Sequence, residues 1–130
     1  MAYVYEITGS MRNIPVDTEL IFPNIQTCIA LTGVAGGNLV GAHATLADRT
    51  RMLRIGRAMQ KRATGLSHIF VVGPAVGYNL GPLTDVARVH VLVTEAYIDV
   101  RAVATPGRPQ FYKRPMNGDV WEALDSKLFS

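Results

Sequence analysis

The stretch TCIALTGVAGGNLVGAHATL, residues 27–46, decides the fold that this sequence predicts. Runs rich in Ile, Leu, Val, Thr and Ala, residues 27–32 and 38–46, flank a turn that contains Gly33, Gly36 and Gly37. Glycine adopts the positive φ angles that a tight reversal needs, and such apolar runs are typical of strands. The sequence therefore predicts a β-hairpin, which carries the only cysteine of the chain, Cys28, and a histidine, His43.

The register of this hairpin decides whether Cys28 and His43 share a face, because side chains alternate along a strand. A loop centred between Ala35 and Gly36 places Cys28 directly opposite His43, at a Cβ separation of about 4.5–5.5 Å. A two-residue loop of Gly36 and Gly37 instead places the two side chains diagonally on one face, about 7–8 Å apart. A three-residue loop sends them to opposite faces. The Gly-Gly pair favours a loop with an even number of residues.

A thiol beside an imidazole is suited to nucleophilic chemistry. A free thiol titrates at about pH 8.5, and a neighbouring imidazole can hold it as the thiolate that attacks amide or ester carbonyls. The imidazole then returns the proton to the leaving group. A second interpretation stays open, because a lone cysteine usually packs in the core and a strand histidine is usually only hydrogen-bonded.

The order of a Cys at a strand start, a Gly-containing reversal and the strand sequence Gly-Ala-His-Ala-Thr at residues 41–45 resembles the cysteine–histidine glutamine deamidases. These include the catalytic domains of cytotoxic necrotizing factor-type toxins and the chemoreceptor deamidase CheD. The resemblance covers about twenty of the 130 residues. It implies that Cys28 is the nucleophile and His43 the general base and acid. Ile-Gln-Thr, residues 25–27, stands before the Cys where these families usually have Ser-Gly or Gly-Ser.

The resemblance also implies a third group that orients the imidazole, either a threonine a few residues before the cysteine or a backbone carbonyl. Phe22 stands six residues before Cys28, so we expect a main-chain carbonyl from residues 3–7. Backbone N–H groups near Cys28 are expected to hold the oxyanion. Side-chain candidates for the orienting and oxyanion roles are Thr27, Asn24 and Thr45.

The glycine- and proline-rich stretch GPAVGYNLGP, residues 73–82, follows a buried run and predicts a loop. It has no Lys-Ser/Thr pair and no GxGxxG, so it does not match a phosphate-binding loop. Tyr78 and Asn79 are candidates for substrate contact, beside a purely structural use of the loop. His68 and His90 stay open as rival bases. The three histidines lack the local spacing of a zinc site, so no metal or other cofactor is expected.

Length and composition predict one soluble domain. The 130 residues suit a single core, and one cysteine makes no internal disulfide. No basic-then-apolar leader and no apolar run near the length of a membrane span occurs. We therefore expect a cytoplasmic protein, or one exported without an N-terminal signal peptide into a target cell. The net charge of +3 says little about nucleic acid.

Local patterns predict the other elements. Residues 2–8 read as a strand and residues 11–23 as an irregular connection. Asp48 caps a helix that ends near residue 63, with a stop at Gly65. A central strand spans residues 67–73, a short helix or strand begins at 83–89, and residues 88–93 favour strand. Residues 97–105 and 108–114 form a second hairpin, and residues 120–128 form a terminal helix with Trp121 in the core.

These elements predict an α/β protein, a single domain in which a mixed or antiparallel, sandwich-like sheet is covered by two to three helices. The helix at 48–64 is basic. It carries six of the thirteen basic residues, namely Arg49, Arg51, Arg54, Arg57, Lys61 and Arg62. No aromatic residues interleave with these cations, which makes nucleic acid an unlikely partner. The oligomeric state, a homo-oligomer included, stays open.

The sequence thus favours a cysteine hydrolase that acts on amides, most concretely a protein glutamine deamidase. The resemblance implies either a bacterial toxin-like effector or a CheD-like enzyme. Its partner would be a protein substrate, held through Arg51, Arg54, Lys61 and Arg62. A thiol protease or an acyl transferase uses the same pair of residues. The alternative is a non-catalytic binding or assembly module that uses the basic helix as its contact surface.

Overall fold

The computed structural model describes residues 1–7, 11–45 and 48–130. Its elements in chain order are β1 (Ala2–Tyr3), β2 (Val16–Asp17), β3 (Glu19–Ile25), β4 (Ile29–Ala35), β5 (Asn38–Ala44), α1 (Arg49–Arg62), β6 (His68–Gly73), the 3₁₀ helix η1 (Gly81–Asp85), β7 (Arg88–Val93), β8 (Ile98–Val103), β9 (Gln110–Pro115), β10 (Glu122–Leu124) and the 3₁₀ helix η2 (Ser126–Leu128).

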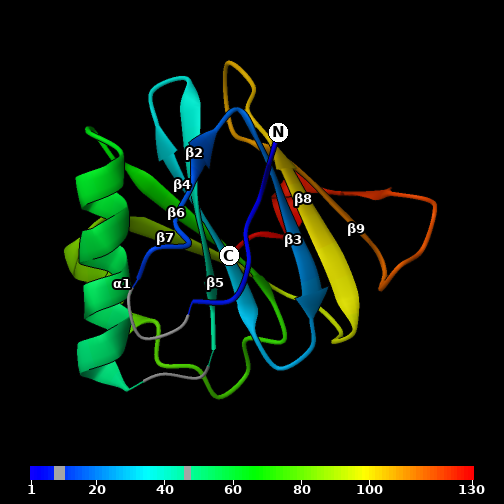
Figure 1. Ribbon diagram of the computed structural model, residues 1–130, viewed down its shortest axis with the longest axis horizontal. Coiled ribbons are helices and arrows are strands. Elements are labelled where there is room, and N and C mark those ends of the chain that lie inside the picture. Colours follow the sequence, from blue (N-terminus) through cyan, green and yellow to red (C-terminus); the bar gives the residue numbers. More distant parts are fainter. Residues whose placement is uncertain (8–10, 46–47) are drawn as a thin grey trace.

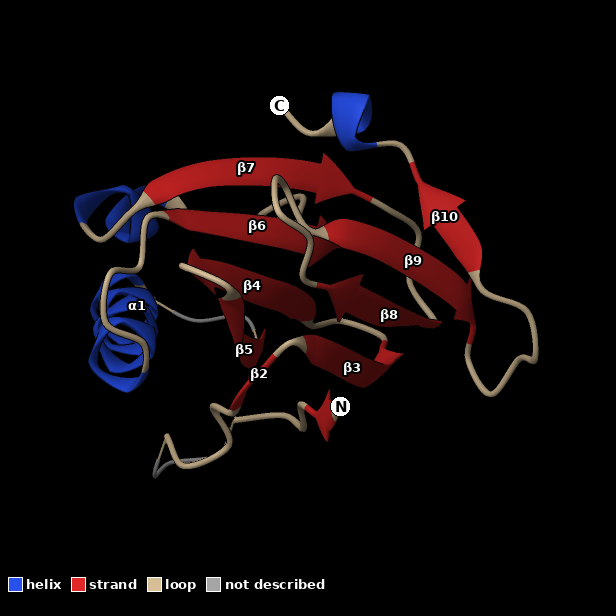
Figure 2. Cartoon of the chain, turned by 90° about the horizontal axis from the view of Figure 1, so that it is seen from above, coloured by secondary structure: helices blue, strands red, loops and turns tan. Residues whose placement is uncertain are grey.

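The described residues form two five-stranded sheets and one α-helix, stacked as three layers. The first sheet has the order β1-β3-β8-β9-β10 and the second sheet the order β2-β5-β4-β6-β7. Figures 1 and 2 show α1, the second sheet and the first sheet in that order. The expected domain with mixed sheets is confirmed. The expected two to three covering helices are not, because the described residues hold one α-helix and two short 3₁₀ helices.

The hairpin forms as the pair β4 and β5, joined by a two-residue turn of Gly36 and Gly37. Ala35 pairs with Asn38 next to the turn, and Ala30 pairs with His43 further along. The positive φ of 62° falls on Gly36, the first of the two turn residues, as in a type II′ turn. Of the two registers that a loop with an even number of residues allows, this is the one expected to place Cys28 and His43 diagonally on one face.

Apolar residues fill the space on both sides of the second sheet. Between the two sheets, Leu20 and Phe22 of the first sheet meet Val72 of the second. Between the second sheet and α1, Leu31 packs with Met59 and other helix residues. Full burial of one such side chain stabilises the folded state by about 1.5–3 kcal/mol. Because apolar side chains are buried on both of its faces, the second sheet is held in place by the first sheet and by α1.

Helix α1 has the predicted start, stop and buried face. The Asp48 side chain caps its N-terminus by accepting a hydrogen bond of 2.8 Å from the backbone N–H of Arg51. Gly65 has a φ of 83° just beyond its end. The buried side of α1 packs against the second sheet and comprises Met52, Ile55, Gly56 and Met59. No helix within the described ranges is long and apolar enough to cross a membrane.

The predicted first strand is wrong beyond Tyr3. Val4 and Ile7 are both buried, which breaks a two-residue alternation, while Tyr3 and Tyr5 are 47% and 58% exposed. The physical reason is that the chain changes sheets here. The backbone N–H of Val4 donates to Ile21 in the first sheet, and that of Ile7 donates to His43 in the second. The last residue of the predicted strand, Thr8, lies outside the described residues.

The predicted irregular connection at 11–23 contains a central strand. β3 pairs with β8 and with β1, and its register shifts between Phe22 and Ile25. Pro23 and Asn24 occupy this shift, and Asn24 has a φ of 60°. A bulge tolerates a residue that has no N–H to donate, so the proline does not end the strand.

The predicted helix at 120–128 is also wrong, because β10 and η2 occupy this segment. Leu124 pairs with Phe111 at the edge of the first sheet, while Val120 and Leu128 are 76% and 61% exposed. Trp121 is half-buried, and its ring lies 4.2 Å under the Arg114 guanidinium carbon. The second predicted hairpin is confirmed as β8 and β9. The segment at 81–93 forms η1 and then β7, so both alternatives left open there are present.

Gly41 leaves room for the N-terminal residues to pack between the sheets. A Cβ at Gly41 would lie 2.8 Å from Val4 Cγ2 and 2.9 Å from Leu20 Cδ1. We expect Gly41→Val to lower the free energy of unfolding by about 1–3 kcal/mol, the usual cost of overpacking. Gly37→Val is the matched control, because nothing lies within 4 Å of a Cβ there. Urea denaturation of both variants measures the difference, and equal stability would contradict this packing.

Candidate functional site

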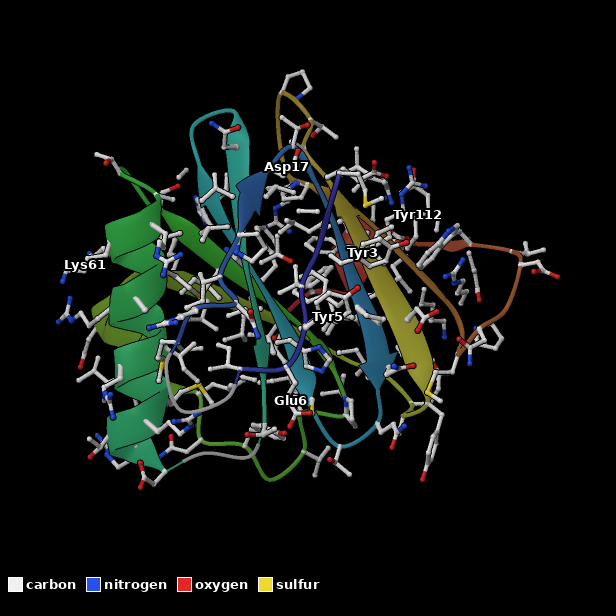
Figure 3. The ribbon with its side chains drawn as sticks, in the orientation of Figure 1. Tyr3, Tyr5, Glu6, Asp17, Lys61 and Tyr112 are labelled. Atoms are coloured by element: carbon white, nitrogen blue, oxygen red, sulfur yellow. The ribbon has the colours of Figure 1, made fainter. Side chains whose placement is uncertain are left out.

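Residues 4–7, which we call the N-terminal strap, lead from the first sheet to the end of β5. The strap begins with the Val4 N–H donating to Ile21 at 2.7 Å and ends with the Ile7 N–H donating to His43 at 3.0 Å. Between them, Glu6 forms a parallel bridge with His43. Figure 3 shows Tyr3, Tyr5 and Glu6 following one another along this segment. The strap therefore covers His43 from the side of the first sheet.

The strap supplies the main-chain carbonyl that we expected beside the imidazole. His43 Nδ1 lies 3.1 Å from the Val4 carbonyl oxygen. A carbonyl oxygen only accepts, so Nδ1 carries the proton and Nε2 keeps its lone pair. His43 is 3% exposed, and its Nε2 has no hydrogen-bond partner among the described residues.

Burial sets the charge of this imidazole. Desolvation lowers the pKa of His43, against smaller raising effects from the Val4 carbonyl and the Glu6 carboxylate. His43 is therefore neutral at physiological pH, with a basic nitrogen held in a fixed direction. A buried polar nitrogen without a hydrogen-bond partner is costly in a folded protein, and a catalytic role is one of the explanations for such a group.

Cys28 lies one residue before β4, on the same face as His43 by the observed register. It is 6% exposed. Burial raises the pKa of the thiol, the Glu6 carboxylate raises it further, and a hydrogen bond with the Thr27 side chain lowers it. The expectation that the imidazole holds a thiolate in the resting protein is therefore wrong. His43 Nε2 makes no hydrogen bond to the sulfur, and low polarity disfavours the charged form of both groups.

The loop at 73–82 forms one wall beside Cys28. The Tyr78 hydroxyl donates to the Thr27 carbonyl at 2.5 Å. Burial, followed by the charges of Cys28 and Glu6, raises the pKa of Tyr78 to about 12. A hollow of about 360 Å³ opens here, and its lining residues are Gln26, Thr27, Pro74, Val76, Gly77 and Tyr78. Cys28 follows directly on Gln26 and Thr27 in the chain but is not itself among the residues that line the hollow.

Gly73 allows this loop to approach the cysteine. It has a φ of 140°, and a Cβ there would lie 3.2 Å from the Cys28 carbonyl oxygen and 3.3 Å from Ile29 Cα. A side chain would therefore press on the backbone of β4. The glycine lets β6 leave the sheet closely enough for Tyr78 to reach Thr27.

The structure gathers some of the predicted site residues and leaves others out. Thr27, Cys28 and Tyr78 lie together, and His43 is linked to Cys28 and Tyr78 through the charge of Glu6, which acts on all three. Asn24 instead donates its backbone N–H to Asp99 at 2.9 Å, and the Asn79 side chain accepts from the Gly81 N–H at 3.1 Å in a local turn. Thr45 is half-buried after the last residue of β5, and no hydrogen bond of the described residues joins it to Cys28 or His43.

Glu6 is a charged residue near the site that the sequence analysis does not include among the candidates. Its side chain is exposed, yet its charge acts on Cys28, His43 and Tyr78 together. The feature of the sequence that could have indicated a role for Glu6 is its position in the strap. A segment that supplies a carbonyl to His43 also carries its neighbouring side chain to the same place, and Glu6 lies two residues after Val4.

The rival bases lie elsewhere. His68 pairs with Val34, at the end of β4 remote from Cys28, and its Nδ1 lies 3.0 Å from His90 Nε2. Among the described residues, no three His, Cys, Asp or Glu side chains gather as metal ligands.

Comparison with protein-family models, with curated proteins and with solved structures finds no match to this chain. Its function is inferred from the geometry of the site.

Proposed function

We propose that the protein is a cysteine hydrolase that acts on amides, most concretely a protein glutamine deamidase. One observation carries the proposal. The Val4 carbonyl fixes the His43 ring through Nδ1, and the buried Nε2, on the face of Cys28, has no partner among the described residues. A nucleophile, a base and a group that orients the base are the parts that such catalysis needs.

The first step forms a thioester. Cys28 Sγ attacks the carbonyl carbon of a glutamine side chain, and the thiol proton passes to His43 Nε2 as the sulfur approaches. The oxyanion is held by backbone N–H groups near Cys28. His43 then gives its proton to the amide nitrogen, the C–N bond breaks, and ammonia leaves.

The second step hydrolyses the thioester. A water molecule attacks the carbonyl carbon and gives one proton to His43. The C–S bond breaks, His43 returns the proton to the sulfur, and glutamate is released. The Val4 carbonyl keeps accepting from Nδ1 throughout, so it stabilises the imidazolium that forms twice in the cycle.

The hollow beside Cys28 suits a side chain rather than a whole peptide. Its volume of about 360 Å³ exceeds what one glutamine side chain needs, and its lining includes Thr27, the chain neighbour of the cysteine, and Tyr78. Val76, at its rim, is 83% exposed and offers an apolar contact to a docked protein surface. These features support a glutamine exposed on a folded protein as the substrate.

The basic helix supports an acidic surface on that substrate protein. Arg54, Lys61 and Arg62 are exposed, and α1 contains no acidic residue. Figure 3 shows Lys61, in the last turn of α1, pointing away from the sheets, and Figure 1 places only the first turn of α1 at the end of the molecule where β4 starts. With Arg51, these residues would attract acidic partners by long-range electrostatics. Such a deamidase would work in its own cytoplasm or, as a bacterial effector, inside a target cell.

The second candidate is a non-catalytic binding or assembly module. The observation that favours it is the same basic face of α1, since burial raises the pKa of the thiol and Cys28 is covered. The two candidates differ in their dependence on Cys28.

Loss of Cys28 separates these candidates. We expect wild-type protein to release ammonia from a glutamine-rich protein such as casein and to add about 1 Da at each modified glutamine, the mass difference between an amide and an acid. Cys28→Ala should abolish the reaction, and His43→Gln should lower kcat/KM by about 10²–10⁴-fold. Ammonia release and mass spectrometry measure both. Full activity of folded Cys28→Ala would refute the hydrolase.

The charge of Glu6 predicts how the thiol titrates. Because this carboxylate raises the pKa of Cys28, Glu6→Gln should lower that pKa and shift the iodoacetamide reaction of the thiol to lower pH. Wild-type Cys28 should react slowly at neutral pH and faster as the pH rises. Tyr5→Phe, which changes no charge on the same strap, is the control. An unchanged pH profile in Glu6→Gln would show that its carboxylate does not act on the sulfur.

The basic helix predicts a preference for acidic surroundings of the glutamine. Two synthetic peptides with one glutamine each, flanked by a run of glutamates or of serines, serve as probes. We expect a higher kcat/KM for the acidic peptide, and the double variant Arg54→Glu, Lys61→Glu should remove this advantage without changing the rate on the serine peptide. Salt should also weaken it. Binding of the acidic peptide without ammonia release would favour the binding module.

A further inference from the structure

A second cleft lies at the end of β4 remote from Cys28, between the two sheets. Its volume is about 110 Å³, and its lining residues are Val34, His68, Phe70, Gly107, Arg108 and Pro109. Figure 1 shows the turn between β4 and β5 and the connection between β8 and β9 at this same end of the molecule. The proposed function uses none of these residues.

His68 lines this cleft and is coupled to a second histidine, His90, which is not itself among the lining residues. β6 and β7 run parallel, and their register brings His68 next to His90, with His68 Nδ1 3.0 Å from His90 Nε2. The rings stack at a centroid distance of 5.2 Å, and Phe70 stacks on His90 at 4.6 Å. A hydrogen bond between two imidazole nitrogens holds one shared proton, so the outer nitrogens, His68 Nε2 and His90 Nδ1, remain for other partners.

Two arginines, Arg108 and Arg88, add positive charge near this pair. Arg108, from the connection between β8 and β9, lies 5.8 Å over the Phe70 ring and donates to the Ser126 carbonyl at 3.5 Å. Arg88 pairs with His68 in the β6–β7 register. Among the described residues, no ion pair involves Arg88 or Arg108. Burial, followed by the charges of Arg108, His68 and Arg88, lowers the pKa of His90.

We infer that this cleft binds a small oxyanion of the phosphate class, held by His68, His90 and Arg108. The cleft of about 110 Å³ is small, which suits a single phosphate group rather than a larger ligand. Phe70 and Pro109 line it with apolar surface, which strengthens the attraction between an anion and the cations. An anion supplies the negative charge that the described neighbours lack.

The hydrogen bond between the histidines links this binding to one proton. In the neutral pair, one outer nitrogen donates and the other has only a lone pair. After one proton is added, the shared hydrogen bond remains and both outer nitrogens donate. The singly protonated pair is therefore the form that an oxyanion prefers, and binding should draw a proton from solution. The positive charges of Arg88 and Arg108 disfavour protonation of the histidine pair until a bound anion neutralises these charges.

Calorimetric titration with inorganic phosphate and with sulfate tests the inference. Sulfate keeps its charge over this range, so any pH effect on its affinity comes from the protein. We expect both anions to bind, and sulfate to bind more tightly at about pH 6 than at about pH 8, on either side of the ordinary histidine pKa of about 6.5. Phenyl phosphate serves as a third probe, because a cleft of this size admits the phosphate group but covers little of the ring. Absence of binding by wild type at both pH values would overturn the inference.

Variants locate the site. His68→Gln, His90→Gln and Arg108→Gln should each weaken sulfate binding by about tenfold or more, since each removes one charged or strong donor. The two histidine variants should also lose the pH dependence, which a merely structural defect would not remove selectively. Arg12→Gln removes the same charge from an exposed position outside the cleft and should change little. An equal loss in Arg12→Gln, or full binding by folded His68→Gln and Arg108→Gln, would contradict this site.

Discussion

The antiparallel register between β4 and β5 is the constraint on which the rest of the structure depends. A turn of two glycines pairs Ala30 with His43, so the imidazole faces the space between the sheets and not α1. A shift by one residue would exchange the two faces of β5 and would bury His43 against the methionines of the helix. The same register turns Gly41 toward the first sheet, where the missing side chain lets Val4 approach and offer its carbonyl to the ring.

The two-sheet arrangement also explains why chemistry collects at the two ends of β4. The middle of the space between the sheets is filled by side chains such as Phe22 and Val72, which leave no room for a ligand. At the ends, loops replace strands and the packing opens. One end carries Cys28 with the loop after Gly73, and the other carries the histidine pair with Arg108. Both clefts therefore form where strands end and loops begin.

The sequence patterns correctly predicted the elements whose formation depends on residues that are close together in the chain. Helix α1 has a capping Asp48, an apolar face at helical spacing and a glycine stop, and it forms as expected. β3 and β10 were missed because their strand character comes from partners distant in the sequence. Pro23 sits in a bulge that only pairing with β8 makes visible, and Leu124 becomes strand because Phe111 lies beside it.

The candidate site divides in the same way. Cys28 and His43 could be placed together from the sequence, because one hairpin carries both and its glycines limit the register. The contribution of Glu6 and the pairing of His68 with His90 could not be predicted from the sequence. Glu6 reaches the site through a chain that changes sheets, and the two histidines, far apart in sequence, meet through parallel strands joined by η1. Spacing along the chain carries no information about such contacts.

The electrostatics of the site favour a proton transfer that accompanies attack over an ion pair formed beforehand. Burial disfavours both the thiolate and the imidazolium, so separating charge between Cys28 and His43 costs free energy in the resting protein. Glu6 stabilises the imidazolium and opposes the thiolate, so its two effects on the transfer have opposite signs. In the proposed reaction the substrate would remove the cost, because negative charge would move from the sulfur to the carbonyl oxygen as the bond forms, while the imidazolium would stay beside Glu6 and the Val4 carbonyl. A site with this balance would keep its thiol protonated, and therefore resistant to oxidation, until an acyl group is present.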